Sequence, residues 1–376
     1  MKKKILTIVG TRPEIIKLSM VIKVLDEYTD HCFVHTGQNY DYELNKIFFE
    51  DLDIREPDYY LDCAGDDLGE TIGNILKKIS KLLLKVKPDA VLIYGDTNSG
   101  LSSIIAKKLQ IPIFHMEAGN RCFDLRVPEE SNRKLIDHIS DVNMVISSNA
   151  KQYLINEGIR ADKIFQVGST VPEVFNYYKD KIYSSKIVDN LGLSKDKYFI
   201  FSIHREENVE NSENLEMIFE SIKSLYLNFK LKIIISTHPR TKKKITNDLI
   251  KKLDSKNIIF MQPFSYTDYS NLMLNSFCVI SDSGTIFEES AILNFPAVTL
   301  RNTHERPEGF DQSVLFMASL SSNNLNSFVE IARKEHEKKR IQTLPDGYDS
   351  HNTSEKVLRI ILSYIDHIRH YGYYKK

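Results

Sequence analysis

Short runs of apolar residues alternate along the chain with longer segments in which apolar residues recur every three to four positions. The short runs predict buried strands, and the longer segments predict helices. The expected strands of the first half are Ile5–Val9, Cys32–Thr36, Ala90–Tyr94, Ile111–His115, Asn143–Ser147 and Ile164–Val167. The expected helices are Pro13–Asp26, Leu68–Lys85, Ser99–Leu109 and Glu129–Ile139. This alternation is typical of βαβ units and predicts a parallel sheet covered on both faces.

The same pattern begins again in the second half, with expected strands Tyr198–His204, Leu231–Thr237, Ile258–Met261, Cys278–Asp282 and Ala297–Arg301. We therefore expect an α/β fold of two Rossmann-like, doubly wound domains that face a cleft. The expected limits are residues 1–171 for the first domain and 172–353 for the second. The segment 354–376, a helix over Ser354–His370 followed by a frayed tail, is expected to pack back on the first domain.

Composition narrows the function classes. The 376 residues include 50 Lys+Arg and 51 Asp+Glu, a net charge of −1, so no overall basic field favours nucleic acid as a partner. The four cysteines form no CxxC pair, which argues against a zinc site and favours a cytoplasmic location. No apolar run approaches the ~18 residues of a membrane-spanning helix. The apolar run that ends at Val9 is also too short for a signal peptide.

Candidate anion-binding residues follow the first expected strand. The segment Gly10–Glu14 forms a strand-to-helix turn, and such turns expose backbone amides to an anion. Arg12 could add a bidentate contact to a phosphate. An ordinary turn with a surface arginine explains this segment equally well. The turn lacks the GxGxxG pattern, which disfavours a nicotinamide site.

Three carboxylates follow neighbouring strands of the first expected domain. Asp96 comes after Ala90–Tyr94, Glu117 comes after the next strand, and Glu129 or Glu130 opens a helix a few residues later. Carboxylates brought together in this way are suited to acid and base catalysis. Each also has a structural explanation, because Asp96 could cap a helix and acidic first-turn residues stabilise the helix dipole.

Basic and small polar residues follow the strands of the second expected domain. His204 and Arg205 end its first strand, and a histidine there could bind phosphate or transfer a proton. The segment Ser283–Thr285 precedes a helix and could bind phosphate through free amides, or it could be a plain helix cap. Glu288 or Glu289 could bind a ribose, and Arg301 and Arg306 follow a further strand, so these residues together fit a nucleoside diphosphate. No histidine pair has the spacing of a metal site.

The ordered motifs GTRPEIIKL, TGQNYD, GDTNS, HMEAGNR, PEESNRK, HREEN, THPRT, SDSGTIFEE and RNTHERPE resemble those of the non-hydrolysing UDP-N-acetylglucosamine 2-epimerases. The resemblance covers about residues 4–311 and implies a glycosyltransferase-B-like fold, a homodimer and no cofactor. It also implies a substrate class, the UDP-activated 2-acetamido sugars. Members of this family invert C2 of the sugar by eliminating UDP to give a 2-acetamidoglycal and then adding UDP back.

The resemblance also implies roles for individual residues, because the reaction moves the C2 proton and releases a pyrophosphate. Matching motifs imply catalytic roles for Asp96, Glu117, Glu129 and His204. They imply substrate contacts for Arg12, Lys17, Arg205, Tyr269, Ser283, Gly284, Glu289 and Arg306.

The chain departs from the common family pattern at three places. Glu206 stands where an arginine is usual, Thr285 where a glycine is usual, and Asn120–Arg126 replaces a Leu-Arg-Thr type of segment. These variants resemble the branch that makes UDP-N-acetyl-L-fucosamine from UDP-2-acetamido-2,6-dideoxy-L-talose for capsule or O-antigen synthesis. Interconversion of UDP-GlcNAc and UDP-ManNAc is the close alternative, and a glycosyltransferase of the same fold is a further one.

Overall fold

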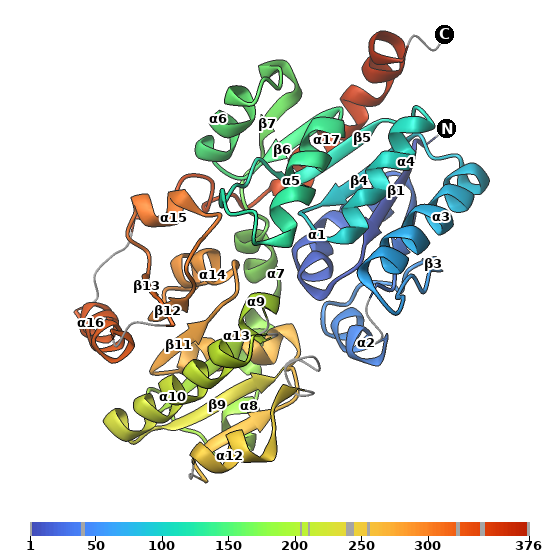
Figure 1. The fold of residues 1–376 in the computed structure, drawn as a ribbon. Helices are drawn as coiled ribbons and strands as arrows, with labels where there is room; N and C mark the ends of the chain where they lie inside the picture. Colours follow the sequence, from blue (N-terminus) through green and yellow to red (C-terminus); the bar gives the residue numbers. More distant parts are fainter. Residues whose placement is uncertain are drawn as a thin grey trace. The chain divides into compact units, whose positions relative to one another are not determined.

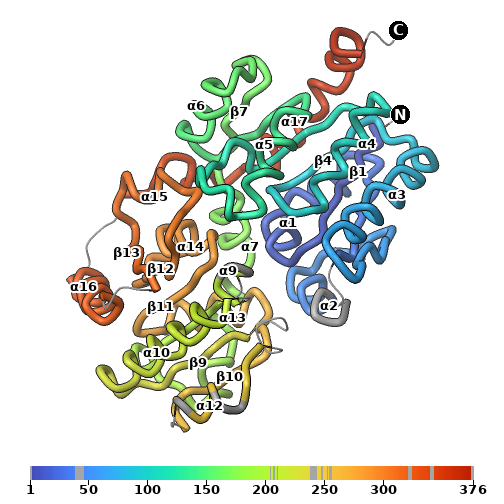
Figure 2. Tube along the Cα trace, in the orientation of Figure 1, coloured from blue at the N-terminus to red at the C-terminus, as the bar shows by residue number. Residues whose placement is uncertain are grey.

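The computed structural model describes residues 2–38, 42–203, 205–209, 211–237, 244–253, 256–320, 324–338 and 343–373, and Figure 2 colours the trace by position. The candidate His204 lies outside the described residues. The chain divides into two compact units. The N-terminal unit comprises Met1–Tyr177 and Asp346–Lys376, and the C-terminal unit comprises Tyr178–Pro345. A domain can in principle fold alone, whereas a compact unit need not. The expected domain limits at 171 and 353 therefore remain predictions.

The N-terminal unit contains a parallel sheet that has seven strands in the described part of the chain, in the order β3-β2-β1-β4-β5-β6-β7 (Figure 1). The strands are β1 (Lys4–Val9), β2 (Asp30–His35), β3 (Tyr59–Tyr60), β4 (Ala90–Tyr94), β5 (Ile113–Ala118), β6 (Val142–Val145) and β7 (Ile164–Gln166). The order reverses between β1 and β4. Open α/β sheets bind ligands beside the carboxyl ends of the strands at such a reversal.

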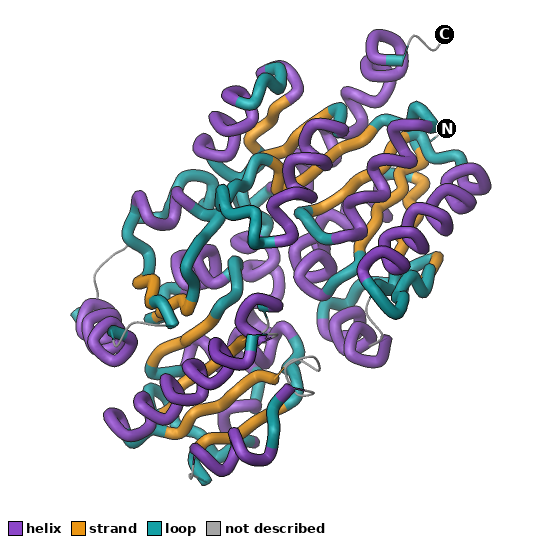
Figure 3. Tube along the Cα trace, viewed as in Figure 1, coloured by secondary structure: helices purple, strands orange, loops and turns teal. Residues whose placement is uncertain are grey.

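Helices alternate with these strands along the chain (Figure 3). They are α1 (Arg12–Tyr28), α2 (Tyr42–Asp51), α3 (Leu68–Val86), η1 (Asn98–Leu101), α4 (Ser102–Lys108), α5 (Pro128–Ile139), α6 (Ser148–Asn156), η2 (Ala161–Lys163), α7 (Val171–Ser184), α17 (Thr353–His367) and η3 (Ile368–Gly372). Helices α3, α4 and α5 cover one face of the sheet, where Ile79, Ala106 and Ile136 share a core with Leu6 and Ile93. Helix α1 packs on β1 and β2, and α17 packs on α1.

The C-terminal unit contains a second parallel sheet, six-stranded within the described residues, in the order β10-β9-β8-β11-β12-β13. Its strands are β8 (Tyr198–Ile203), β9 (Lys232–Thr237), β10 (Ile258–Met261), β11 (Cys278–Ser281), β12 (Ala297–Leu300) and β13 (Phe316–Ala318). Its helices are α8 (Ile187–Asn190), α9 (Glu206–Val209), α10 (Ser212–Phe229), α12 (Asn247–Leu253), α13 (Tyr266–Asn275), α14 (Ile286–Leu293), α15 (Pro307–Asp311) and α16 (Leu325–Glu337). Here the strand order reverses between β8 and β11.

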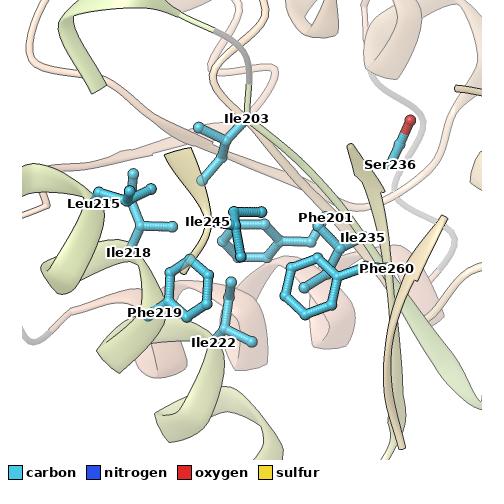
Figure 4. Close-up of a pocket in the computed structure, with 10 residues that line it drawn as sticks. All are labelled: Phe201, Ile203, Leu215, Ile218, Phe219, Ile222, Ile235, Ser236, Ile245 and Phe260. Atoms are coloured by element: carbon cyan, nitrogen blue, oxygen red, sulfur yellow. The ribbon is translucent and has the colours of Figure 1, made fainter. Parts of the chain in front are cut away.

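An apolar cavity lies within the C-terminal unit, lined by side chains of β8, β9, β10 and α10 that include Phe201, Phe219 and Phe260 (Figure 4). Ser236 is the polar residue among those that line it. This lining gives a charged ligand no compensating partners, so the cavity is a packing defect of the core and not a site for a charged substrate. No described helix combines the length and the low polarity that crossing a membrane requires.

Three sequence-based expectations need correction. The strand expected at Ile111–His115 is instead Ile113–Ala118, so Glu117 lies within the strand and not after it. The expected helix Ser99–Leu109 begins as the 3₁₀ turn η1 and only then becomes α4. The expected frayed tail is wrong up to Tyr373, because the hydroxyl of Tyr373 donates a hydrogen bond to Asp141 Oδ2 at 2.7 Å.

Candidate active site

Glu117 lies where β5 leaves its regular register with β6. The pairing shifts between Met116 and Ala118, and Glu117 itself has a left-handed backbone with a φ of 59°. Its Oε2 lies 2.6 Å from Lys17 Nζ of α1 and accepts a hydrogen bond of 2.6 Å from the Tyr94 hydroxyl at the end of β4. The bulge therefore turns Glu117 toward the point where the strand order reverses, and α1 and β4 hold it there.

Asp96 follows β4 after one intervening glycine and makes an ion pair. Its Oδ2 lies 2.7 Å from Arg133 Nε of α5. The helix-cap alternative for Asp96 is wrong, since the residue that precedes η1 is Thr97. About a quarter of the Asp96 side chain stays exposed. Asp96 is thus held by a cation and remains accessible to solvent.

The two glutamates that open α5 have different surroundings. Glu130 is fully buried, pairs with Arg133 Nη1 at 2.8 Å, and accepts hydrogen bonds from the backbone amides of Cys122 and Phe123 at 3.1 Å each. Burial raises its pKa, but these hydrogen bonds and Arg133 outweigh burial and leave the pKa below its usual value. Glu130 therefore holds the preceding loop in place, whereas Glu129 is half-buried and remains the candidate for chemistry.

A buried network fixes the loop that follows Glu117. Asp137 of α5 lies 2.9 Å from His115 Nδ1 and 2.7 Å from Arg121 Nη1, and it accepts a hydrogen bond from the Gly119 amide. Burial raises the pKa of Asp137, and His115 and Arg121 more than reverse that effect. Arg121 also pairs with Glu157 at 2.6 Å. The network ties β5, its following loop and α5 into one rigid element.

Glu14 occupies the point where the strand order reverses in the N-terminal sheet. It is 2 % exposed, and its Oε2 accepts hydrogen bonds from the Gly10 amide and the Thr11 hydroxyl. Its Oε1 accepts hydrogen bonds from the hydroxyls of Thr97 and Ser99. Burial raises the pKa of Glu14 to about 6, although the hydrogen bonds oppose this shift. Glu14 therefore joins the loop after β1, which carries Arg12, to the loop after β4, which carries Asp96.

This raised pKa predicts a pH-dependent stability. Folded Glu14 binds its proton more tightly than an ordinary glutamate, whose pKa is 4.5. Its contribution to stability is therefore fully present below about pH 4.5 and is lost as the pH rises through about 6. At pH 7.5 the buried carboxylate costs about 2 kcal/mol relative to its protonated form. We expect Glu14→Gln to be more stable than the parent chain at pH 7.5 by up to about that amount, in urea unfolding.

The advantage of Glu14→Gln is expected to vanish near pH 4.5, because glutamine resembles the protonated acid. Its amide oxygen can face Gly10 and Thr11, and its NH₂ group can donate to the hydroxyls of Thr97 and Ser99. Glu27→Gln on the exposed part of the same helix provides the matched control and should show no such pH dependence. Equal stability differences at both pH values would contradict the role assigned to burial.

Arg12 begins α1 and is half-buried, with its guanidinium carbon 5.7 Å from the ring centroid of Phe48 in α2. The cation therefore lies against an aromatic face at the carboxyl edge of the sheet. This position agrees with the sequence-based interpretation of a cation beside the turn, and a contact with phosphate remains a prediction.

In the C-terminal unit, a buried carboxylate likewise lies where the strand order reverses. Asp282 follows β11, and its Oδ2 accepts hydrogen bonds of 3.0 Å from the Arg205 amide after β8 and from Asn208 of α9. The Arg205 side chain donates to the Asp282 carbonyl at 2.9 Å and lies 3.3 Å from Glu305. Asp282 thus fixes the backbone directly after His204, although His204 itself is outside the described residues.

The segment before α14 is closely packed against a second ion pair. A Cβ atom on Gly284 would collide with Glu305 Oε1, and Glu305 pairs with Arg301 Nη2 at 2.5 Å. A larger residue at position 284 would therefore have to displace the Glu305 carboxylate from this ion pair. The cap alternative is supported at Ser283, whose Oγ accepts a hydrogen bond of 3.3 Å from the Thr285 amide and lies 2.9 Å from the Thr285 hydroxyl. Thr285, which directly precedes α14, makes no side-chain cap bond of its own.

The remaining candidates of the C-terminal unit lie in two groups. Arg306 is 1 % exposed and pairs with Glu288 of α14 at 3.1 Å. Glu289 lies on the same helix and is close enough to Tyr269 of α13 to help burial raise the pKa of that phenol. Tyr269 also packs beside Phe264, with ring centroids 6.4 Å apart. Arg306 therefore belongs to the interior of the unit, whereas Glu289 and Tyr269 are half-buried neighbours.

Sequence reasoning missed several residues that organise these sites, namely Glu14, Tyr94, Arg133, Asp137, Asp282 and Glu305. Tyr94 and Asp282 are the last residues of expected strands. This position was the one sequence signal that could have marked them as site residues. Among the described residues, no group of three or more potential metal ligands is arranged to hold an ion. The N-terminal unit thus contributes carboxylates and a lysine as candidate site residues. The C-terminal unit contributes arginines and the start of helix α14.

Comparison with known proteins identifies relatives of this chain. Residues 23–362 match the family model described as UDP-N-acetylglucosamine 2-epimerase. The UDP-N-acetylglucosamine 2-epimerase from Rickettsia bellii has a similar structure, with a TM-score of 0.92 and 48 % identity over 100 % of both chains.

The crystal structure of the Methanocaldococcus jannaschii UDP-GlcNAc 2-epimerase in complex with UDP-GlcNAc and UDP gives a TM-score of 0.89 at 37 % identity, over 96 % of this chain and 99 % of that one. A UDP-2,3-diacetamido-2,3-dideoxy-D-glucuronate 2-epimerase from Pseudomonas aeruginosa is 37 % identical over 80 % of this chain and 84 % of its own length. These matches confirm the expected fold class of two parallel-sheet α/β domains. The chain belongs to the UDP-N-acetylglucosamine 2-epimerase family.

Proposed function

We propose that this chain inverts C2 of a UDP-linked 2-acetamido sugar by eliminating UDP and adding it back. The observation that supports this proposal is the position of Asp96 and Glu117 at the carboxyl ends of the neighbouring strands β4 and β5, where Arg133 and Lys17 pair with them. Glu129 lies in the first turn of α5, the helix that carries Arg133. Epimerisation requires a base that removes the C2 proton on one face and an acid that returns a proton on the other. Several carboxylates in different surroundings can divide these tasks.

In the elimination, the C2–H bond and the bond between C1 and the UDP oxygen break, and a C1–C2 double bond forms in the glycal. In the re-addition, UDP attacks C1 and a proton arrives at C2 from the opposite face. Departure of the pyrophosphate needs positive charge and backbone amides. The C-terminal unit supplies Arg205 and the start of α14 for this purpose, and His204 stays a proposed catalytic residue from the sequence motif.

Incubation with the UDP sugar in D₂O tests this function directly. We expect NMR to show the C2 epimer with deuterium at C2, together with a small pool of UDP and glycal. Inversion without deuterium at C2 would contradict proton removal, and formation of a glycoside with an added acceptor would favour a glycosyltransferase instead.

We further propose that the preferred substrate is UDP-2-acetamido-2,6-dideoxy-L-talose, which yields UDP-N-acetyl-L-fucosamine. Phe123 supports this proposal because its side chain is 66 % exposed on the loop that Glu130 holds, and it packs edge-on against Tyr153. Phe123 follows Cys122, whose Sγ lies 3.4 Å from Arg133 Nη1, and an exposed aromatic ring on this loop could contact the apolar 6-methyl group of such a sugar. We expect a higher kcat/KM for this substrate than for UDP-GlcNAc, and Phe123→Ser should reduce the preference.

Interconversion of UDP-GlcNAc and UDP-ManNAc is the second candidate, because relatives at 37 % and 48 % identity carry the name UDP-GlcNAc 2-epimerase. A higher kcat/KM for UDP-GlcNAc in the same comparison would establish this alternative. The motif resemblance also supports a homodimer and a role in making capsule or O-antigen precursors. Sedimentation at micromolar concentration tests the dimer, which should sediment as twice the 43.5 kDa chain.

A further inference from the structure

Tyr94 contacts two candidate residues of the N-terminal unit at once. It is the last residue of β4 and is 4 % exposed. Its hydroxyl donates to Glu117 Oε2 at 2.6 Å, and its ring centroid lies 5.5 Å from Lys17 Nζ. Lys17 Nζ lies 2.6 Å from the same Oε2 atom of Glu117. The three side chains therefore form a closed group in which each contacts the other two.

The backbone places these groups with little freedom. Tyr94 is in register with Met116 of β5, so Glu117 follows directly on the neighbouring strand. The chain beyond Tyr94 is fixed as well, because the Gly95 carbonyl bonds His115 Nε2 at 2.8 Å. His115 in turn contacts the buried Asp137. The backbone of Tyr94 is thus fixed by its pairing with β5, and the burial of the side chain restricts the ring to the side of Glu117.

The hydrogen-bond roles in this group suit an ionised Glu117. The phenol hydroxyl and the ammonium group both donate to the same oxygen, Oε2, at 2.6 Å each. Two donors on one oxygen stabilise the negative charge of a carboxylate more than they stabilise the neutral acid. The face of the Tyr94 ring also attracts the ammonium of Lys17. Tyr94 thus favours an ionised Glu117 and restricts its side chain to one orientation.

We propose that Tyr94 is a positioning residue of the C2 epimerisation, which orients Glu117 through its hydroxyl and Lys17 through its ring. The inference rests on the proposed function, in which Glu117 is one of the carboxylates that carry the C2 proton. Neither a pattern of carboxylates nor a phosphate-binding turn in the sequence indicates such a role for the last residue of a buried strand. The role does not require contact between Tyr94 and the substrate.

The Tyr94→Phe variant tests this role, because phenylalanine keeps the ring against Lys17 and removes only the hydroxyl. We expect kcat to fall about 10- to 100-fold, since a misplaced reacting group costs rates of that order. The KM for the UDP sugar should stay within about twofold, because the hydroxyl contributes orientation and not binding. Deuterium incorporation at C2 should slow by the same factor as kcat.

Tyr198→Phe is the matched control. Tyr198 is also buried, and its hydroxyl donates to the Leu272 carbonyl at 2.7 Å in the C-terminal unit, remote in sequence from the Glu117 group. We expect this variant to lower the thermal midpoint while kcat stays unchanged. An unchanged kcat in Tyr94→Phe overturns the positioning role, and so does a loss of kcat that merely follows a lower thermal midpoint or a raised KM. A parent chain that is inactive on every UDP-2-acetamido sugar overturns the proposed function itself.

Discussion

Replacing Glu117 by glutamine is expected to lower kcat by about a thousandfold while the variant still binds UDP. Glutamine has the size of glutamate and retains one acceptor oxygen for the Tyr94 hydroxyl and Lys17 Nζ, so the local geometry should survive. Its amide cannot accept the C2 proton, and it removes the negative charge that a base supplies. NMR of C2 inversion in D₂O measures the loss, and calorimetry with UDP measures the binding.

UDP binding should persist because the residues proposed to hold the nucleotide, apart from Arg12 and Lys17, belong to the C-terminal unit, which has its own sheet and core. Glu27→Gln serves as the matched control, since it makes the same substitution at an exposed position of α1. Its kcat should equal that of the parent chain. A fall in kcat of less than tenfold for Glu117→Gln would remove Glu117 from the chemistry. Loss of UDP binding would show that the substitution acts through the fold.

The meeting of the candidate carboxylates could be predicted from the sequence for a simple physical reason. In a parallel sheet, the carboxyl ends of all strands lie at one edge, so residues that follow buried apolar runs become neighbours. Asp96, at the end of the expected strand Ala90–Tyr94, followed this rule, and that strand was predicted with its observed limits. Strands β3 and β13 were missed. The two residues of β3 are too few to form an apolar run, whereas β13 lies within the apolar run 314–318 and was overlooked.

The partners of these carboxylates were beyond the reach of sequence reasoning. Asp96 and Arg133 are 37 positions apart, and Lys17 and Glu117 are 100 positions apart, so no local spacing connects them. Glu117 also depends on a change in register that an apolar pattern does not encode. For Glu14, a local pattern was present but suggested a different role. An acidic residue in the first turn of a helix indicates dipole stabilisation, whereas the side chain of Glu14 joins two loops.

Both units place a buried carboxylate at the point where their strand order reverses. Glu14 joins the loops after β1 and β4, and Asp282 joins the segment after β8 to the end of β11. Loops that carry reactive groups lack the ladder hydrogen bonds that fix a strand, so another acceptor must satisfy their amides and hydroxyls. In both units a buried carboxylate accepts these hydrogen bonds, which indicates that Glu14 and Asp282 set the geometry of the loops. The neighbouring residues are the ones proposed to perform the chemistry.

Asp137→Ala is expected to produce the largest loss of stability among the substitutions considered for the N-terminal unit. Removal of this carboxylate leaves the buried guanidinium of Arg121 without the partner at 2.7 Å and leaves the Gly119 amide without its acceptor. Breaking a buried ion pair in this way costs about 3–5 kcal/mol. Urea unfolding of the whole chain measures the loss, and kcat should also fall because the loop after Glu117 loses its support.

Glu157→Ala is the matched control, because Glu157 is the other carboxylate that pairs with Arg121. Because the Glu157 side chain is 25 % exposed, water can replace part of its interaction with Arg121. We expect the free energy of unfolding to fall by about 1 kcal/mol. Both variants remove one carboxylate from the same guanidinium, so the difference between them reports the burial of Asp137 together with its contacts to Gly119 and His115. Equal losses in the two variants would contradict the assigned role of Asp137. A large loss of stability in Asp137→Ala with an unchanged kcat would show that Asp137 stabilises the fold but does not position Glu117.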